Sequence, residues 1–131
     1  MNTAANSSVR DTILLIDDDP MTTELFGEIL AHQYDVRVAN NFDEAIQIIR
    51  SEPLIAVISD YHIGQWSADA LFIWLQKERS VLANSFILLT GDKLADLSLF
   101  TGHTTVMFKP VRIPELLDTV SQILRPSLSI T

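Results

Sequence analysis

The chain has 131 residues and a formal net charge of -8 at pH 7. This length suits one domain, which buries roughly two-thirds of the surface that its unfolded chain exposes. The nine lysine and arginine residues are too few and too scattered to neutralise nucleic-acid phosphates, so no direct nucleic-acid partner is expected. The absence of cysteine excludes disulfides and thiolate metal sites, and it fits a cytoplasmic protein.

No apolar stretch approaches the roughly 18 residues that cross a bilayer, and the first residues lack the pattern of a signal peptide. We therefore expect no membrane partner. The two ends of the chain are mostly small and polar. We expect a flexible N-terminal tail over residues 1–11, a domain over 12–125, and a C-terminal tail or the start of a linker over 126–131.

Five runs rich in apolar residues predict the strands of a sheet. A strand that is apolar throughout must be covered on both faces, as in a parallel sheet that lies between helices. The predicted strands are residues 13–16, 36–39, 54–59, 86–89 and 105–108.

A helical pattern follows each strand. The first helix is predicted to begin with Asp19 as N-cap and Pro20 at its first position, and to end near Tyr34. The residues predicted to face inward from this helix are Leu25, Phe26, Ile29 and Leu30.

Cap signals place the remaining helices. Either Asn40 or Asn41 caps the second helix, which Pro53 prevents from continuing, and either Ser67 or Asp69 caps the third. A short fourth helix is predicted over residues 92–100 and a last helix over 114–124. Strands and helices therefore alternate five times. The economical arrangement is an α/β fold in which a doubly wound, five-stranded parallel sheet carries helices on both faces.

Four of the predicted strands end in residues suited to phosphoryl chemistry. The acidic run 17–19 follows the first strand, Asp60 follows the third, Thr90 the fourth and Lys109 the fifth. In an open α/β sheet, ligand sites lie at the carboxyl ends of the strands. Hard divalent cations take oxygen ligands, and lysine attracts phosphate as a point charge. The pattern predicts a divalent-metal pocket with an anion-binding rim.

The order and spacing of these residues resemble the receiver domain of two-component response regulators, over residues 12–125. The resemblance implies a flavodoxin-like (βα)5 fold. It implies that Asp60 accepts a phosphoryl group, that Thr90 is the conformational-switch hydroxyl, and that Lys109 is the family's lysine before a proline.

The resemblance also implies a metal site. The family's acidic pair corresponds to Asp17 and Asp18, which with Asp60 and the backbone carbonyl of His62 would hold Mg²⁺ or Mn²⁺. The chain would then be the phospho-accepting receiver of a phosphorelay. It would not be an enzyme in the usual sense, but it would assist its own phosphorylation and dephosphorylation. The implied partners are a sensor histidine kinase or histidine phosphotransfer protein, an output protein or attached domain, and a second copy in a phosphorylation-linked dimer.

Three features depart from the family pattern. Val106 stands three residues before Lys109, where the family usually has an aromatic switch residue, and Phe108 is not expected to replace it. The segment from Thr90 to Lys109 is a few residues shorter than usual. Gly64 stands where proline is usual, so the loop after the acceptor is expected to be mobile before metal binds.

Two other functions stay open. A receiver-like module could keep the pocket and signal by protein contact, independently of phosphorylation. A haloacid-dehalogenase-like phosphatase could use Asp17 as its nucleophile, because the run 17–19 also matches the Asp-x-Asp motif of that family. That family's later acidic motif is absent, however, and Asp60 would have no role.

Overall fold

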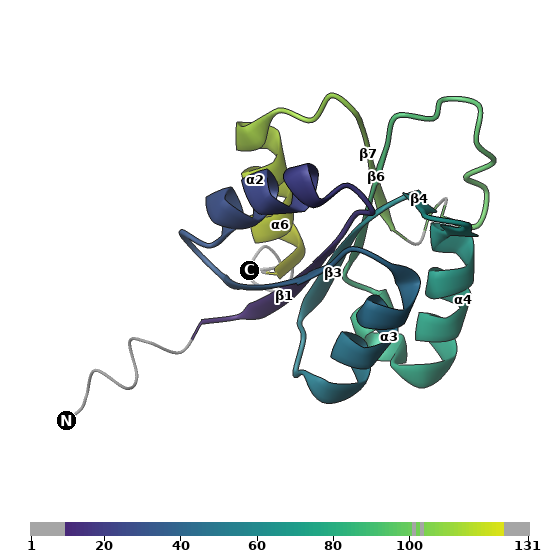
Figure 1. Ribbon diagram of the computed structural model, residues 1–131, viewed down its shortest axis with the longest axis horizontal. Coiled ribbons are helices and arrows are strands. Elements are labelled where there is room, and N and C mark those ends of the chain that lie inside the picture. The colour runs from purple at the N-terminus through teal and green to yellow at the C-terminus, as the bar shows by residue number, and fades with distance from the viewer. Residues whose placement is uncertain (1–9, 101, 103, 125–131) are drawn as a thin grey trace, which may run out of the picture.

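The computed structural model describes residues 10–100, 102 and 104–124. At its centre is a sheet of five parallel strands (Figure 1). In spatial order the strands are β2 (Asp35–Ala39), β1 (Thr12–Ile16), β3 (Ala56–Asp60), β6 (Phe86–Thr90) and β7 (Thr105–Phe108). This order and these directions confirm the predicted doubly wound, flavodoxin-like fold.

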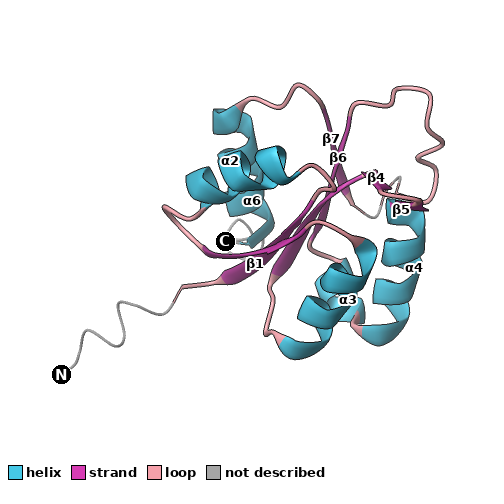
Figure 2. Ribbon diagram, in the orientation of Figure 1, coloured by secondary structure: helices cyan, strands magenta, loops and turns pink. Residues whose placement is uncertain are grey.

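Helices cover both faces of the sheet (Figure 2). The helices α2 (Pro20–Leu30) and α6 (Ile113–Leu124) cover one face, and α3 (Phe42–Ser51), α4 (Ala68–Glu78) and the short α5 (Ser80–Ala83) cover the other.

The alternation of side chains along each strand builds a separate core on each face. In β1, Ile13 and Leu15 belong to the core under α2 and α6, whereas Leu14 and Ile16 belong to the core under α3 and α4. All four are at most 1% exposed. This two-sided burial is why the central strands read as continuous apolar runs.

Side-chain caps fix the starts of two helices. Asp19 caps α2 by accepting a hydrogen bond from the Met21 N–H (3.1 Å), with Pro20 at the first helical position, as predicted. Asn41 caps α3 by accepting from the Glu44 N–H (2.9 Å), which decides between the two predicted candidates. Ser67 is the N-cap of α4, without a side-chain hydrogen bond.

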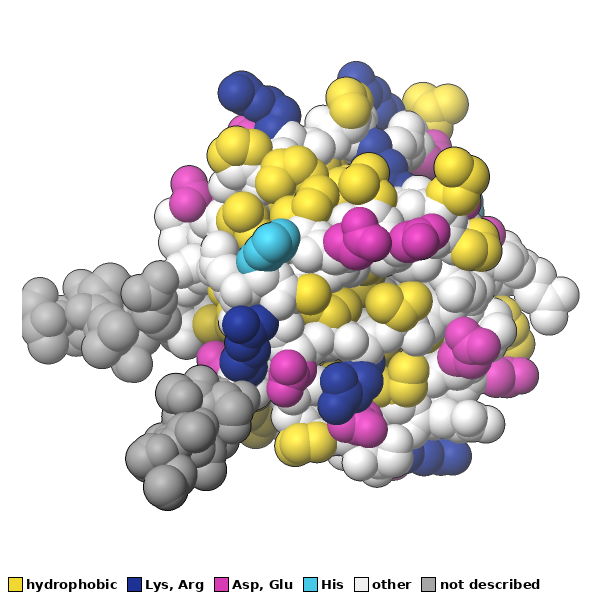
Figure 3. Space-filling view, turned by 60° about the vertical axis from the view of Figure 1, so that its left-hand side comes forward, with side chains coloured by type: hydrophobic (Ala, Val, Ile, Leu, Met, Phe, Trp, Pro, Cys, Tyr) yellow, Lys and Arg dark blue, Asp and Glu magenta, His cyan; other side chains and the backbone are white. Residues whose placement is uncertain are grey.

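The first helix differs from its prediction in two ways. It ends at Leu30 and a turn follows, so Tyr34 lies outside the helix and packs into the core. Leu25 is 57% exposed and does not face inward; Thr23, only 2% exposed, occupies the buried face. A polar residue can lie there because its hydroxyl donates to Pro20 O and accepts from Asn40 Nδ2. Figure 3 shows hydrophobic side chains gathered on the side of the molecule where α2 lies.

The prediction of a fourth helix over residues 92–100 is wrong. The described residues between β6 and β7 form turns and bends. Asp92 Oδ1 accepts from the Leu94 N–H and Asp96 Oδ1 accepts from the Ser98 N–H, each at 3.0 Å. Such local bonds from aspartate side chains offer the backbone an alternative to the helix. Phe100, fully buried, anchors this segment in the core of α3 and α4.

Two small elements were not predicted. The short helix α5 follows α4, and a hairpin of β4 (His62–Ile63) and β5 (Trp66–Ser67) replaces the expected mobile loop after Asp60. Of the predicted tails, residues 1–9 and 126–131 lie outside the described residues. Among the residues that the structure describes, no helix is long and apolar enough to cross a membrane.

Candidate functional site

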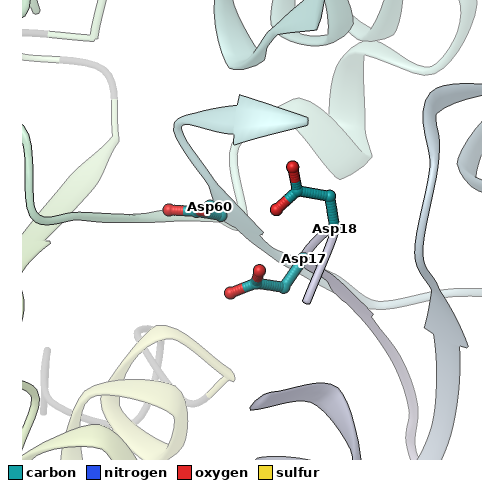
Figure 4. A group of neighbouring side chains, drawn as sticks. All are labelled: Asp17, Asp18 and Asp60. Carbon is teal, nitrogen blue, oxygen red and sulfur yellow. The ribbon is translucent and has the colours of Figure 1, made fainter. Parts of the chain in front are cut away.

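The carboxyl ends of β1 and β3 bring three carboxylates together (Figure 4). Asp17, Asp18 and Asp60 each contribute an oxygen atom, and these oxygens lie within 4.8 Å of one another. Asp17 and Asp18 directly follow β1, and Asp60 is the last residue of the neighbouring β3. The sequence therefore predicted correctly which acidic residues meet at this edge.

Lys109 links two of these carboxylates. It directly follows β7, and its Nζ lies 3.3 Å from Asp17 Oδ2 and 3.2 Å from Asp60 Oδ1. Burial alone would lower the pKa of Lys109, but Asp60 and Asp17 together outweigh burial and raise it above its usual value. The lysine is therefore held in its charged form between the two aspartates.

Asp60 has an uneven environment at its two oxygens. Oδ1 accepts a hydrogen bond from the Tyr61 N–H (2.9 Å) and faces Lys109, whereas Oδ2 has no partner among the described residues. Burial raises the pKa of this carboxyl, Asp17 adds to the increase, and Lys109 and the Tyr61 N–H only partly oppose it. The net effect is a raised pKa, so the fold disfavours the ionised form of this carboxyl.

Asp17 and Asp18 differ in how firmly they are held. Asp17 is 4% exposed, and it accepts from the Asp19 N–H (3.0 Å) as well as pairing with Lys109. Asp18 is exposed, and its carboxylate accepts one hydrogen bond, from the Gly64 N–H (3.1 Å). Asp17 is thus held by Lys109 and its own turn, and Asp18 by the hairpin.

Thr90 closes the row of strand ends. It is fully buried at the end of β6, whose Leu89 is the register partner of Asp60. Its Oγ1 accepts from the Asp92 N–H (3.0 Å). The hydroxyl therefore lies one strand away from Asp60 and is tied to the start of the irregular segment.

His62 and Asp92 span the gap between β4 and the segment after β6. His62 Nε2 lies 3.0 Å from Asp92 Oδ2. This hydrogen bond, with those from the Leu94 and Ala95 N–H groups, lowers the pKa of Asp92 below its usual value. The His62 side chain thus bonds to Asp92 and not to the cluster of Asp17, Asp18 and Asp60. Its backbone carbonyl is the group left for the predicted ligand role.

Two supporting contacts were not predicted from the sequence. Asn40 was considered only as a helix cap, yet its Nδ2 donates to Asp17 O and so braces the acidic turn (2.9 Å). Phe108 was given no role, yet it is the register partner of Thr90 and is 48% exposed. Val106, two residues earlier, packs against the core of α3 and α4. Neither contact has a motif of its own, so only the fold reveals them.

The donor set suits a hard divalent cation. The cluster holds three carboxylates and one ammonium group, which pairs with Asp17 and Asp60, so it keeps an excess of negative charge. Carboxylate oxygens are the ligands that Mg²⁺, Mn²⁺ and Ca²⁺ prefer. Burial, and after it Asp17, raises the pKa of Asp60. A cation bound in this cluster would lower that pKa again.

No family model matches the chain. It is 27% identical over 127 residues to a Vibrio cholerae protein described as "Probable cyclic di-GMP phosphodiesterase". That match covers 92% of this chain and 29% of the relative, so the chain spans under a third of the relative's length.

Several solved structures are similar to the chain over most of their length. The receiver domain of a response regulator from Methanospirillum hungatei has a TM-score of 0.81 at 24% identity, covering 94% of this chain and 100% of that one. The receiver domain of an HD domain-containing protein from Pseudomonas fluorescens has a TM-score of 0.79 at 26% identity, covering 92% and 99%. That of a signal transduction histidine kinase from Syntrophus aciditrophicus has a TM-score of 0.76 at 27% identity, covering 89% and 92%. The chain therefore has the fold of a signal receiver domain.

Proposed function

We propose that this receiver accepts a phosphoryl group on Asp60, in the presence of Mg²⁺, from a histidine kinase or histidine phosphotransfer partner. The observation that supports this proposal is the asymmetry of the Asp60 carboxylate. Lys109 and the Tyr61 N–H hold Oδ1, and Oδ2 is left without a partner among the described residues. Oδ2 is then the oxygen placed to attack phosphorus.

In this reaction, an Oδ2–phosphorus bond forms and the bond from phosphorus to the donor's nitrogen or oxygen breaks, which leaves an acyl phosphate on Asp60. Asp17, Asp18, Asp60 and the His62 carbonyl would hold the cation. Once bound, the cation supplies neutralisation of the charge that develops on the phosphoryl oxygens. Lys109 pairs with one phosphoryl oxygen as a point charge. The Thr90 hydroxyl donates to another.

The geometry favours Asp60 over Asp17 as the nucleophile. Both oxygens of Asp17 are engaged, one by the Asp19 N–H and the other by Lys109, and the residue is 4% exposed. A phosphatase reaction through Asp17 would first have to break these contacts. Signalling without phosphorylation stays a second candidate, because turns replace the fourth helix and Val106 replaces the aromatic switch residue.

Intact-mass measurement after incubation with acetyl phosphate and Mg²⁺ tests the proposal. We expect one added phosphoryl group on the wild type, none on Asp60→Asn, and one on Asp118→Asn, which changes an exposed aspartate of α6. A wild type that stays unmodified while Mg²⁺ binds would favour the phosphorylation-independent module.

A further inference from the structure

The hairpin β4–β5 lies beside the carboxylates. Its two strands pair His62 with Ser67 and Ile63 with Trp66, and Gly64 and Gln65 form the turn between them. Gly64 has a φ of +61°, in the left-handed region that glycine adopts without a steric cost. A two-residue turn of this kind favours a tight hairpin.

The tip of this hairpin reaches one carboxylate of the site. The Gly64 N–H donates to Asp18 Oδ2 at 3.1 Å, across 46 residues of sequence. Asp18 is exposed, unlike Asp17, and this is the hydrogen bond that holds its carboxylate among the described residues. The orientation of Asp18 therefore depends on where the hairpin tip lies.

An aromatic pair fixes the hairpin to the neighbouring helix. The rings of Trp66, in β5, and Phe42, the first residue of α3, are stacked with centroids 4.6 Å apart and planes 20° apart. Trp66 is 46% exposed, so it is not held by burial in the core. A hollow of about 300 Å³, lined by Phe42, Asp43, Gly64 and Trp66, separates the tip from α3. The stack is thus a contact that bridges the tip and the start of α3, beside the burial of Ile63 in the core under α3 and α4.

We propose that the Phe42–Trp66 stack positions Asp18 for the divalent cation, by holding the hairpin tip where the Gly64 N–H can orient the Asp18 carboxylate. This inference rests on the metal site of the proposed function. Phe42 and Trp66 are positioning residues, because neither contributes a ligand atom. A carboxylate that is ordered in advance loses less freedom on binding, so the stack should tighten Mg²⁺ binding by about two- to tenfold.

The test is calorimetric titration of Mg²⁺ into Trp66→Leu, Phe42→Leu and the double variant, with folding checked by circular dichroism. We expect each single variant to weaken Mg²⁺ binding by about two- to tenfold. The double variant should be no weaker than the weaker single variant, because both changes remove one contact. Trp66→Phe, which keeps an aromatic ring, should restore most of the affinity.

Trp74→Leu is the matched control. It removes the other tryptophan, whose ring lies in α4 under Arg50 (5.6 Å), and it should leave Mg²⁺ affinity unchanged. Amide exchange without metal gives an independent readout: the Gly64 N–H should exchange faster in Trp66→Leu and Phe42→Leu only.

The outcomes separate the two proposals. Unchanged Mg²⁺ affinity in folded Trp66→Leu, or a loss equal to that of Trp74→Leu, would overturn the positioning role and leave the metal site intact. A wild type that binds no Mg²⁺ would overturn both.

Discussion

The residues around Asp60 form two flanks that are built differently. On the lysine flank, formed by Lys109 after β7 and Asp17 after β1, one lysine pairs with two carboxylates, and Asp17 is almost fully buried. On the β6 flank, Thr90 leads into turns in which side-chain caps replace a helix, with Phe100 as their buried anchor. The first flank holds charge in a fixed geometry, whereas the second has little regular structure to resist movement.

The two flanks also differ in how their acidic groups are balanced. Asp69, at the start of α4, has a buried Oδ1 without a hydrogen-bond partner among the described residues, and burial followed by Asp96 raises its pKa. Burial, then Asp69, Asp92 and Asp96, raise the pKa of Tyr61. This flank thus gathers acidic groups, and none of them forms an ion pair with a lysine among the described residues. We infer that a phosphoryl group on Asp60 would be anchored by the lysine flank and sensed by the β6 flank.

The largest expected effect concerns the anchor of the β6 flank. Phe100 is fully buried against Phe72 and Phe86, with ring centroids 5.2 and 6.0 Å away. Phe100→Ala should lower the free energy of unfolding by about 3–5 kcal/mol, measured by urea denaturation. Leu94→Ala, at a residue 96% exposed in the same segment, should change it by about 0.5 kcal/mol or less. Equal effects would mean that the segment has no core anchor.

The next effect concerns the lysine flank. Lys109→Met should slow phosphorylation by acetyl phosphate about a hundredfold or more, because a preorganised cation at the developing charge is lost. The exposed Lys93 in the β6–β7 segment is the control, and Lys93→Met should keep the wild-type rate. A similar rate in both variants would contradict the role of the ion pairs with Asp17 and Asp60.

A smaller rate effect is expected at Thr90. Thr90→Ala removes a hydroxyl donor to a charged group, which corresponds to about 1.5–3 kcal/mol, or roughly a ten- to hundredfold slower phosphorylation. Thr90→Ser keeps the hydroxyl and should stay near the wild-type rate. Should Thr90→Ser be as slow as Thr90→Ala, the methyl group rather than the hydroxyl would matter.

The smallest effect is on stability without metal. The pKa of Asp60 is raised from 3.8, first by burial and then by Asp17, so its ionised form costs stability at pH values above its folded pKa. Asp60→Asn should therefore raise the free energy of unfolding at neutral pH by on the order of 1 kcal/mol or less, and with it the melting temperature. This advantage should shrink as the pH falls through the folded pKa, because wild-type Asp60 then becomes neutral. A lower melting temperature for Asp60→Asn at pH 7 would contradict the raised pKa.

The strands and the convergence of the acidic residues could be predicted from sequence because both depend on short-range patterns. Runs such as residues 13–16 report burial on two faces, and parallel strands bring their carboxyl ends to one edge. The cap residues Asp19 and Asn41 were predictable for the same reason, since each acts within three residues of its own position.

The failures involve competition between local and distant contacts. The segment after β6 was predicted as a helix over residues 92–100, but the Asp92 and Asp96 side chains bond to nearby backbone N–H groups and favour turns. The hairpin with Gly64 packs on α3 through the stack between Trp66 and Phe42, which lie 24 positions apart and share no sequence signal. Thr23 rather than Leu25 is buried in α2, and the Asn40 side chain donates to the Thr23 hydroxyl from another element.

The most direct test of the account is to locate the phosphoryl group. Borohydride reduces an acyl phosphate on aspartate to homoserine, so treatment after phosphorylation, followed by peptide sequencing, marks the modified residue. We predict homoserine in place of Asp60 and unmodified aspartate at positions 17, 18 and 19. Homoserine in place of Asp17, with Asp60 unchanged, would contradict the account and support the phosphatase reaction.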